Sequence, residues 1–194
     1  MPHPPGVADL LAALAGVLAR LGVRWYLFGA QAVMVWGRPR LSADVDVTVA
    51  LGAGRVAELV DALGAAGFRP RIVRDLDAFV ARTRVVPLVH ESSQLPLDLV
   101  LAGSGLEQEF LGRAKPVDLD GVTVPVIAPD DLLVTKFLAG RPKDLEDARA
   151  VLERAHRGLD LDRVRTLLRS LDRVLDRGDL ERQLDAELAR LRPG

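Results

Sequence analysis

The stretch FGAQAVMVWGRPRLSADVDVTV, residues 28–49, holds the pattern that decides how the chain folds. A glycine ends an apolar segment, a short helical segment follows, and a turn rich in Gly, Pro and Arg leads into an alternating strand. In that strand Asp44 and Asp46 are two positions apart, so their side chains share one face while the valines share the other. Two like charges on one face of a strand require a chemical reason.

A second strand, LPLDLVL at residues 95–101, carries one isolated carboxylate. Its leucines alternate onto one face, which leaves Asp98 on the other, and a buried carboxylate needs a partner. We expect this strand to lie beside the strand of Asp44 and Asp46, so that three carboxylates converge on Mg²⁺ or Mn²⁺, which prefer hard oxygen ligands. The alternative is that Asp44 and Asp46 form the solvated face of a half-exposed strand, with Asp98 in water at a strand end.

Outward from these strands, hydrophobic periodicity and turn residues predict a mixed set of elements. Helices are expected at 10–21, 30–37, 54–67 and 104–114, and strands at 23–29, 42–51, 84–90, 95–101 and 121–127. The strands at 84–90 and 95–101 are predicted to be antiparallel neighbours, and 121–127 is predicted to be an edge strand because it contains Pro125.

From residue 129 onward the pattern is wholly helical, with helices expected at 129–140, 143–155, 160–171 and 179–192. The sequence therefore predicts an α+β fold: a mixed or antiparallel sheet flanked by helices in residues 1–128, then a helical subdomain in residues 129–194. Acidic and basic residues balance in the last helices, which favours a solvated, ion-paired surface over an RNA-binding arm.

Composition excludes several classes of protein. The 194 residues are 49% hydrophobic and 27% charged, which is typical of a globular protein, and the net charge of −1 gives no overall attraction to polyanions. The absence of cysteine excludes disulfides, thiolate nucleophiles and cysteine-based zinc sites, and the three histidines lack metal-binding spacing. The apolar run at 10–19 follows no Lys or Arg and is too short to cross a bilayer, so we expect a cytoplasmic protein without membrane partners.

Lys136 stands out because only three of the 26 Lys and Arg residues are lysines. It lies beside the apolar stripe of its expected helix, which fits either a snorkelling side chain or a point charge that reaches a triphosphate. Asp144 and Asp147, three positions apart, are expected to orient Lys136 or Arg141 rather than to catalyse.

Taken together, the glycine after a strand, the short helix, Asp-x-Asp and a third Asp on a later strand resemble the signature of the nucleotidyltransferase superfamily with the DNA polymerase β-like palm. The chain also resembles the branch that contains the AbiEii-type toxins, through RLSADVD (40–46) and TKFLAGRPKDLEDA (135–148). The likeness covers about residues 23–150. It departs from the family at Ala30, where a second Gly or a Ser is usual, and at Ser42, which replaces a threonine but keeps the hydroxyl.

The resemblance implies roles for these residues. Asp44 and Asp46 would bridge two metals, and Asp98 would hold the catalytic metal and take the acceptor proton. Backbone N–H groups near Gly29 and Ala30, with the Ser42 hydroxyl, would bind phosphates. Positive charge there would come from Arg40 and Lys136, and the implied nucleotide-binding set is completed by Arg141 and Asp144.

The activity implied is Mg²⁺-dependent transfer of an NMP from an NTP to an acceptor hydroxyl. The family likeness favours RNA, tRNA or protein as the acceptor, in a toxin–antitoxin or phage-defence system with a cognate antitoxin as a further partner. A small-molecule acceptor such as an aminoglycoside is one alternative, and a non-catalytic binding module of the same fold is another. A phosphatase or kinase is disfavoured, because the expected histidines or Walker-type loop are missing.

Overall fold

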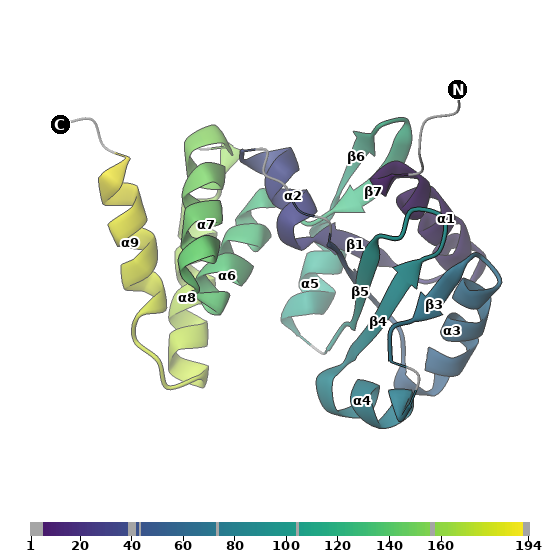
Figure 1. Ribbon diagram of the computed structural model, residues 1–194. Helices are drawn as coiled ribbons and strands as arrows, with labels where there is room; N and C mark the ends of the chain where they lie inside the picture. Colours follow the sequence, from purple (N-terminus) through teal and green to yellow (C-terminus); the bar gives the residue numbers. More distant parts are fainter. Residues whose placement is uncertain are drawn as a thin grey trace. The chain divides into compact units, whose positions relative to one another are not determined.

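The computed structural model describes residues 6–38, 42, 44–72, 74–103, 105–155 and 158–191. Two compact units are present. The first is built from the described parts of residues 1–31 and 41–127, and the second from those of residues 32–40 and 128–194. A sheet with helices forms the first unit, and helices form the second (Figure 1).

In the described part of the chain, a seven-stranded mixed sheet forms the centre of the first unit. Its strands are β1 (Trp25–Phe28), β2 (Val45–Val49), β3 (Phe68–Pro70), β4 (Val85–His90), β5 (Pro96–Leu101), β6 (Lys115–Leu119) and β7 (Val122–Val126). They lie in the order β3-β4-β5-β2-β1-β7-β6. The β2–β5 and β1–β7 pairs are parallel and the remaining pairs are antiparallel.

Helices cover this sheet because each buries one apolar stripe. They are α1 (Val7–Arg20), the 3₁₀ turn η1 (Ala53–Arg55), α3 (Val56–Gly64), α4 (Leu76–Thr83) and α5 (Leu106–Arg113). All five large apolar side chains on the inner face of α1 are fully buried: Leu10, Leu11, Leu14, Val17 and Leu18. The α1 helix packs on α3 and β7, and Figure 1 shows α1 and α3 on the same side of the sheet. None of the helices in the described residues is long and apolar enough to span a bilayer.

The second unit contains α6 (Pro129–Ala139), α7 (Pro142–Ala155), α8 (Leu161–Val174) and α9 (Leu180–Arg190), and α2 (Gly29–Trp36) runs into it from the first unit. Buried carboxylates tie the helices together in pairs. Asp131 in α6 accepts from Arg163 in α8, and Glu187 in α9 accepts from Arg149 in α7. Proline at the first position of α6 and the left-handed Gly140 after its last residue define the ends of that helix.

The predicted α+β fold, with a mixed sheet followed by helices, is confirmed. The antiparallel pairing of β4 with β5 is also confirmed. The prediction that residues 121–127 form an edge strand is wrong, because β7 lies between β1 and β6. Pro125 lies opposite Pro116 of β6, and in the described residues the β1–β7 pairing is limited to Leu27 with Val126. The missing N–H of Pro125 is therefore tolerated on both sides of the strand.

Candidate functional site

The parallel pairing of β2 with β5 brings two carboxylates side by side. Asp46 lies directly opposite Asp98 in the register, so both side chains leave the same face of the sheet from strands that are about 4.8 Å apart. The prediction that these two strands are neighbours is confirmed. Both aspartates are half-buried, while Asp44, which precedes β2, is exposed.

Asp46 and Asp98 belong to a row of residues that lie opposite one another on neighbouring strands. This row marks the boundary between the buried and the accessible part of the sheet face. The same register places Phe28 of β1 beside Asp46, and Pro87 of β4 beside Asp98. In the next row along the strands, Tyr26 and Thr48 are only 2% and 3% exposed. Asp46 and Asp98 therefore stand where the sheet face opens to solvent, which allows a ligand to reach them. We call Phe28, Asp46, Asp98 and Pro87 the carboxylate row.

The chain turns from β1 into α2 directly against this row. Gly29, the first residue of α2, has a φ of +63°, which favours glycine. A Cβ atom on Gly29 would lie 2.0 Å from Oδ2 of Asp46, far inside van der Waals contact. Position 29 therefore requires glycine for two independent reasons: the backbone conformation and the space taken by the Asp46 carboxylate. Ala30 follows as a buried residue of the same helix.

Gln31 holds the segment that carries Asp44. Its side chain is 3% exposed, and Nε2 donates to the carbonyl oxygens of Ser42 and Asp44 at 3.5 and 3.4 Å. Ser42 is half-buried, and Arg40 lies outside the described residues. Sequence reasoning did not single out Gln31, although a lone polar residue in the apolar helix GAQAVMVW is a usable signal, because a buried amide must find partners.

Asp98 is held by a residue that could not be selected from the sequence alone. Arg71, which follows β3, donates from Nη2 to Oδ1 of Asp98. The two side chains are 40% and 39% exposed, so this ion pair is reached by water. The pairing depends on the order of three strands, and β3 has only three residues, too few for a recognisable alternation.

The donor chemistry of the row fits Mg²⁺. Across the residues that the structure describes, no three His, Cys, Asp or Glu side chains are arranged to hold a metal ion. However, proteins commonly bind Mg²⁺ through one or two carboxylates together with substrate phosphates. Asp46 and Asp98 supply two such carboxylates on one face, so the pair meets that requirement. The metal-binding role of Asp44, Asp46 and Asp98 stays a prediction.

Within the second unit, Lys136 forms a buried cluster with two aspartates. Its Nζ donates to Asp144 Oδ1 at 3.2 Å and to Asp147 Oδ2 at 2.7 Å, and all three residues are at most 7% exposed. Arg141 also donates to Asp144 from the surface. Burial acts to raise the pKa of Asp144, but the hydrogen bonds from Arg141 and Lys136 outweigh it and hold that pKa below its usual value. Asp144 and Asp147 thus contact Lys136, and Asp144 contacts Arg141, as an orienting role of the two aspartates requires. The nucleotide-binding role of Lys136 stays a prediction.

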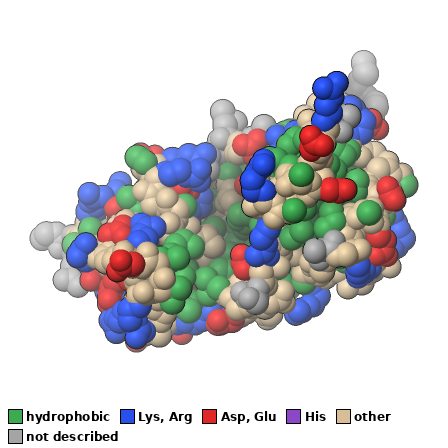
Figure 2. Space-filling view, turned by 90° about the horizontal axis from the view of Figure 1, so that it is seen from below, with side chains coloured by type: hydrophobic (Ala, Val, Ile, Leu, Met, Phe, Trp, Pro, Cys, Tyr) green, Lys and Arg blue, Asp and Glu red, His purple; other side chains and the backbone are tan. Residues whose placement is uncertain are grey.

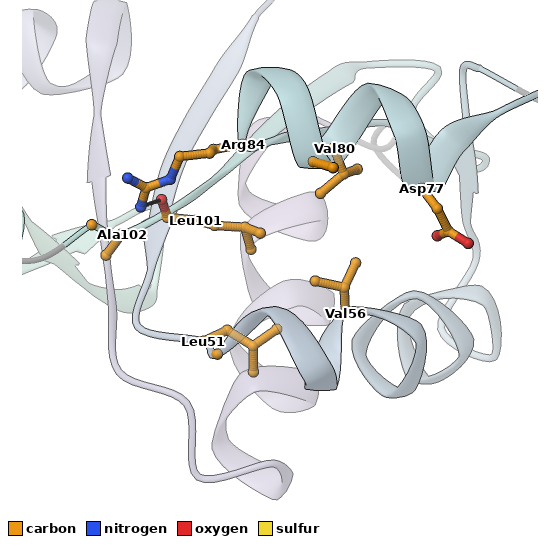
Figure 3. A pocket seen from close by; sticks show the side chains of 10 residues that line it. Leu51, Val56, Asp77, Val80, Arg84, Leu101 and Ala102 are labelled. Carbon is orange, nitrogen blue, oxygen red and sulfur yellow. Dashed lines mark hydrogen bonds between the residues drawn. The ribbon is translucent and has the colours of Figure 1, made fainter.

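A cavity of about 570 Å³ lies at the far ends of β2 and β5 (Figure 3). Leu51, Val56, Val80 and Leu101 direct aliphatic side chains toward it from four different segments. Asp46 precedes Leu51 by five residues, about 16 Å of extended chain. The cavity is therefore distant from the carboxylates of Asp46 and Asp98, and its lining is largely aliphatic with Asp77 and Arg84 as its charged residues.

Comparison with known proteins gives a family match over most of the chain. A family model described as "Nucleotidyltransferase of unknown function (DUF6036)" matches residues 17–186. No curated protein matches the chain.

Solved structures with the same fold share low sequence identity. The antibiotic-resistance factor ANT(2'')-Ia, solved in solution, has a TM-score of 0.56 and 15% identity, over 87% of this chain and 94% of that protein. The lincosamide antibiotic adenylyltransferase LnuA, solved with lincomycin bound, has a TM-score of 0.52 and 14% identity, over 77% and 98%. An antigenic nucleotidyltransferase-like protein from Paracoccidioides brasiliensis has a TM-score of 0.52 and 16% identity, over 95% of each chain. At these identities the likeness shows a shared fold.

Proposed function

The chain belongs to the DUF6036 family of nucleotidyltransferases, and on that basis we propose that it transfers an NMP from an NTP to a hydroxyl group of a small molecule, with Mg²⁺ as the cofactor. The observation that carries this proposal is the register pair of Asp46 and Asp98 on one open sheet face. Two adjacent carboxylates repel each other, and a bound divalent cation would offset that repulsion. The absence of a Cβ at Gly29 lets the Asp46 carboxylate lie directly against the start of α2.

The reaction assigned to the row forms one bond and breaks another. The acceptor hydroxyl oxygen bonds to the α-phosphorus, the bond from that phosphorus to pyrophosphate breaks, and the hydroxyl proton passes to Asp98. Asp44, Asp46 and Asp98 would hold the cation. The chemistry that bound Mg²⁺ supplies is neutralisation of the charge on the transferred phosphoryl group. Gln31 would position Asp44 by fixing the backbone that carries it.

For the nucleotide, we retain the residues implied by the family signature as part of the proposal. Backbone N–H groups at Gly29 and Ala30 lie at the start of α2, where a phosphate is favoured. The Ser42 hydroxyl and the Arg40 guanidinium would add contacts to phosphate oxygens. The family signature also implies nucleotide-binding roles for Lys136, Arg141 and Asp144, and these roles stay predictions.

Two observations favour a small molecule as the acceptor. The structures that share the fold over most of their length include two described as an antibiotic-resistance factor and an antibiotic adenylyltransferase. The chain has a net charge of −1, and the basic and acidic side chains visible on the face in Figure 2 are interspersed. An acceptor such as RNA would require a concentrated basic surface. The proposed acceptor, a small molecule, therefore differs from the RNA, tRNA or protein acceptor that the resemblance to AbiEii-type toxins favoured.

The test is a transfer assay with each α-labelled NTP and Mg²⁺. Three acceptor pools are compared: hydroxylated antibiotics such as aminoglycosides and lincosamides, total RNA, and a protein extract. We expect label to move to a member of the first pool. Asp46→Asn and Asp98→Asn should each lower the rate by about 100-fold or more, as expected for loss of a group that acts in the transition state.

The matched control is Asp61→Asn, which removes an exposed carboxylate from α3 and should leave the rate unchanged. Transfer to RNA or protein alone would replace the acceptor in this proposal. Absence of transfer with every pool, together with absence of Mg²⁺-dependent NTP binding, would identify a non-catalytic binding module instead.

A further inference from the structure

Arg71 extends the carboxylate row by one more strand. Pro70 pairs with Leu88 in the antiparallel β3–β4 register, and the N–H of Arg71 donates to the carbonyl oxygen of Pro87 at 2.9 Å. Arg71 is therefore opposite Pro87, which is opposite Asp98 on the next strand. Its side chain begins on the same face of the sheet as the two carboxylates.

The distance across the row explains why an arginine makes this contact. Two strand spacings separate the backbones of Arg71 and Asp98, about 10 Å. An extended arginine and an aspartate together cover that distance, provided that the residue between them is compact. The proline ring at position 87 meets this condition, and Nη2 of Arg71 reaches Oδ1 of Asp98 across it.

This ion pair uses the carboxylate that the proposed reaction needs. A guanidinium on Oδ1 of Asp98 occupies a lone pair that a cation would use, and its positive charge repels a divalent ion nearby. Breaking the Arg71–Asp98 pair costs little free energy, since ion pairs at this level of exposure contribute little to stability. The buried pair of Lys136 with Asp147 is different, because its side chains are only 9% and 6% exposed.

We propose that Arg71 is a positioning residue that holds Asp98 in the metal-free protein and competes with the divalent cation for it, so that Arg71 sets the metal affinity of the resting site. This inference rests on the proposed function, since it needs Asp98 to be a metal ligand. Arg71 then weakens metal binding before the nucleotide arrives, and the phosphates supply the additional attraction that displaces the guanidinium.

The experiment measures the Kd for Mn²⁺, without nucleotide, by electron paramagnetic resonance of free Mn²⁺ with the full chain. Arg71→Gln should bind Mn²⁺ about fivefold more tightly than wild type, the change expected when an exposed competing pair is removed. Arg71→Lys keeps the charge and should stay close to wild type. The matched control is Arg69→Gln, which lies in β3 two residues before Arg71 and whose partner is Glu91 instead of Asp98. It should leave the Kd unchanged.

Two results separate failure of this inference from failure of the proposed function. If Asp46→Asn and Asp98→Asn weaken Mn²⁺ binding but Arg71→Gln leaves it equal or weaker, the competition is overturned and the metal site stands. It is also overturned if Arg71→Gln tightens binding as much in an Asp98→Asn background as alone. If neither aspartate variant changes the Kd, the proposed metal site fails and this inference fails with it.

Discussion

At the scale of single residues, the site depends on which side chains a parallel register places opposite each other. The sequence predicts that Asp44 and Asp46 share a face. The pairing of β2 with β5 is what places Asp98 directly opposite Asp46. A shift by one residue would send one carboxylate to the opposite face of the sheet. The geometry of the site is therefore a property of two paired strands.

The first residue-level prediction concerns Gly29. Gly29→Ala adds a Cβ that would overlap the Asp46 carboxylate, in addition to the strain of a positive φ. We expect nucleotidyl transfer to fall by at least about 100-fold, as for a displaced catalytic group. The control is Gly22→Ala, with a φ of +62° and nothing within 4 Å of the added atom. It should keep the rate and lose only about 1 kcal/mol of unfolding free energy from strain. Equal activity of the two variants would contradict the close approach.

The second residue-level prediction concerns Gln31. Gln31→Leu removes the donor shared by the carbonyl oxygens of Ser42 and Asp44. We expect a loss of about 1–3 kcal/mol in the free energy of unfolding, because the group is buried. Urea titration checks this against Gln108→Leu, an exposed amide that also donates to a carbonyl oxygen. A stability loss no larger than that of the control would show that Gln31 does not fix this segment.

At the scale of elements, the α6–α7 hairpin is held by the charges of Lys136, Asp144 and Asp147. Lys136→Met removes a buried ammonium from between two buried carboxylates, and we expect a loss of about 3–5 kcal/mol in the free energy of unfolding. Lys143→Met, at an exposed position of α7, should change it by less than about 0.5 kcal/mol. Chemical denaturation followed by helical circular dichroism distinguishes them. A small loss for Lys136→Met would mean that the cluster is not a structural centre.

The same cluster predicts how stability depends on pH. The pKa of Asp144 is lower in the folded protein than in the unfolded chain, where it is about 3.9. Its contribution is therefore complete above that unfolded value and is lost as the pH falls through the lowered folded value. Urea midpoints measured from pH 6 down to pH 2 should decrease less steeply for Asp144→Asn than for wild type. Parallel curves would contradict the assigned pKa shift.

Local signals were enough to predict most elements, and the misses have local causes. Periodic leucines predicted α1, and alternating valines and leucines predicted β2 and β5. The sequence did not predict β3, α4 and β6. Strand β3 has three residues, α4 has one buried residue, Val80, and β6 begins with the exposed pair Lys115 and Pro116. The carboxylates of the site could be predicted from the same alternation. Arg71 could not, because its contact with Asp98 requires the order of β3, β4 and β5.

At the scale of the whole molecule, family membership gives the class of reaction, and the charge balance supports the proposed class of acceptor. The family match covers residues 17–186, so it includes both the strands of the site and the C-terminal helices. With a net charge of −1, the chain gains little from the field of a polyanion. We therefore predict that an excess of total tRNA leaves the rate of transfer to a small-molecule acceptor unchanged. Strong inhibition that disappears at high salt would instead indicate a nucleic-acid acceptor.

The central claim is that Asp46 and Asp98 jointly hold the reacting cation. Its most direct test is a crystal structure with Mn²⁺ and a non-hydrolysable NTP analogue, in which anomalous scattering locates the metal. We predict an anomalous peak within about 2.5 Å of carboxylate oxygens from both residues, with phosphate oxygens completing the coordination. Nucleotide bound with its metal away from both carboxylates, and Arg71 still on Asp98, would contradict the claim.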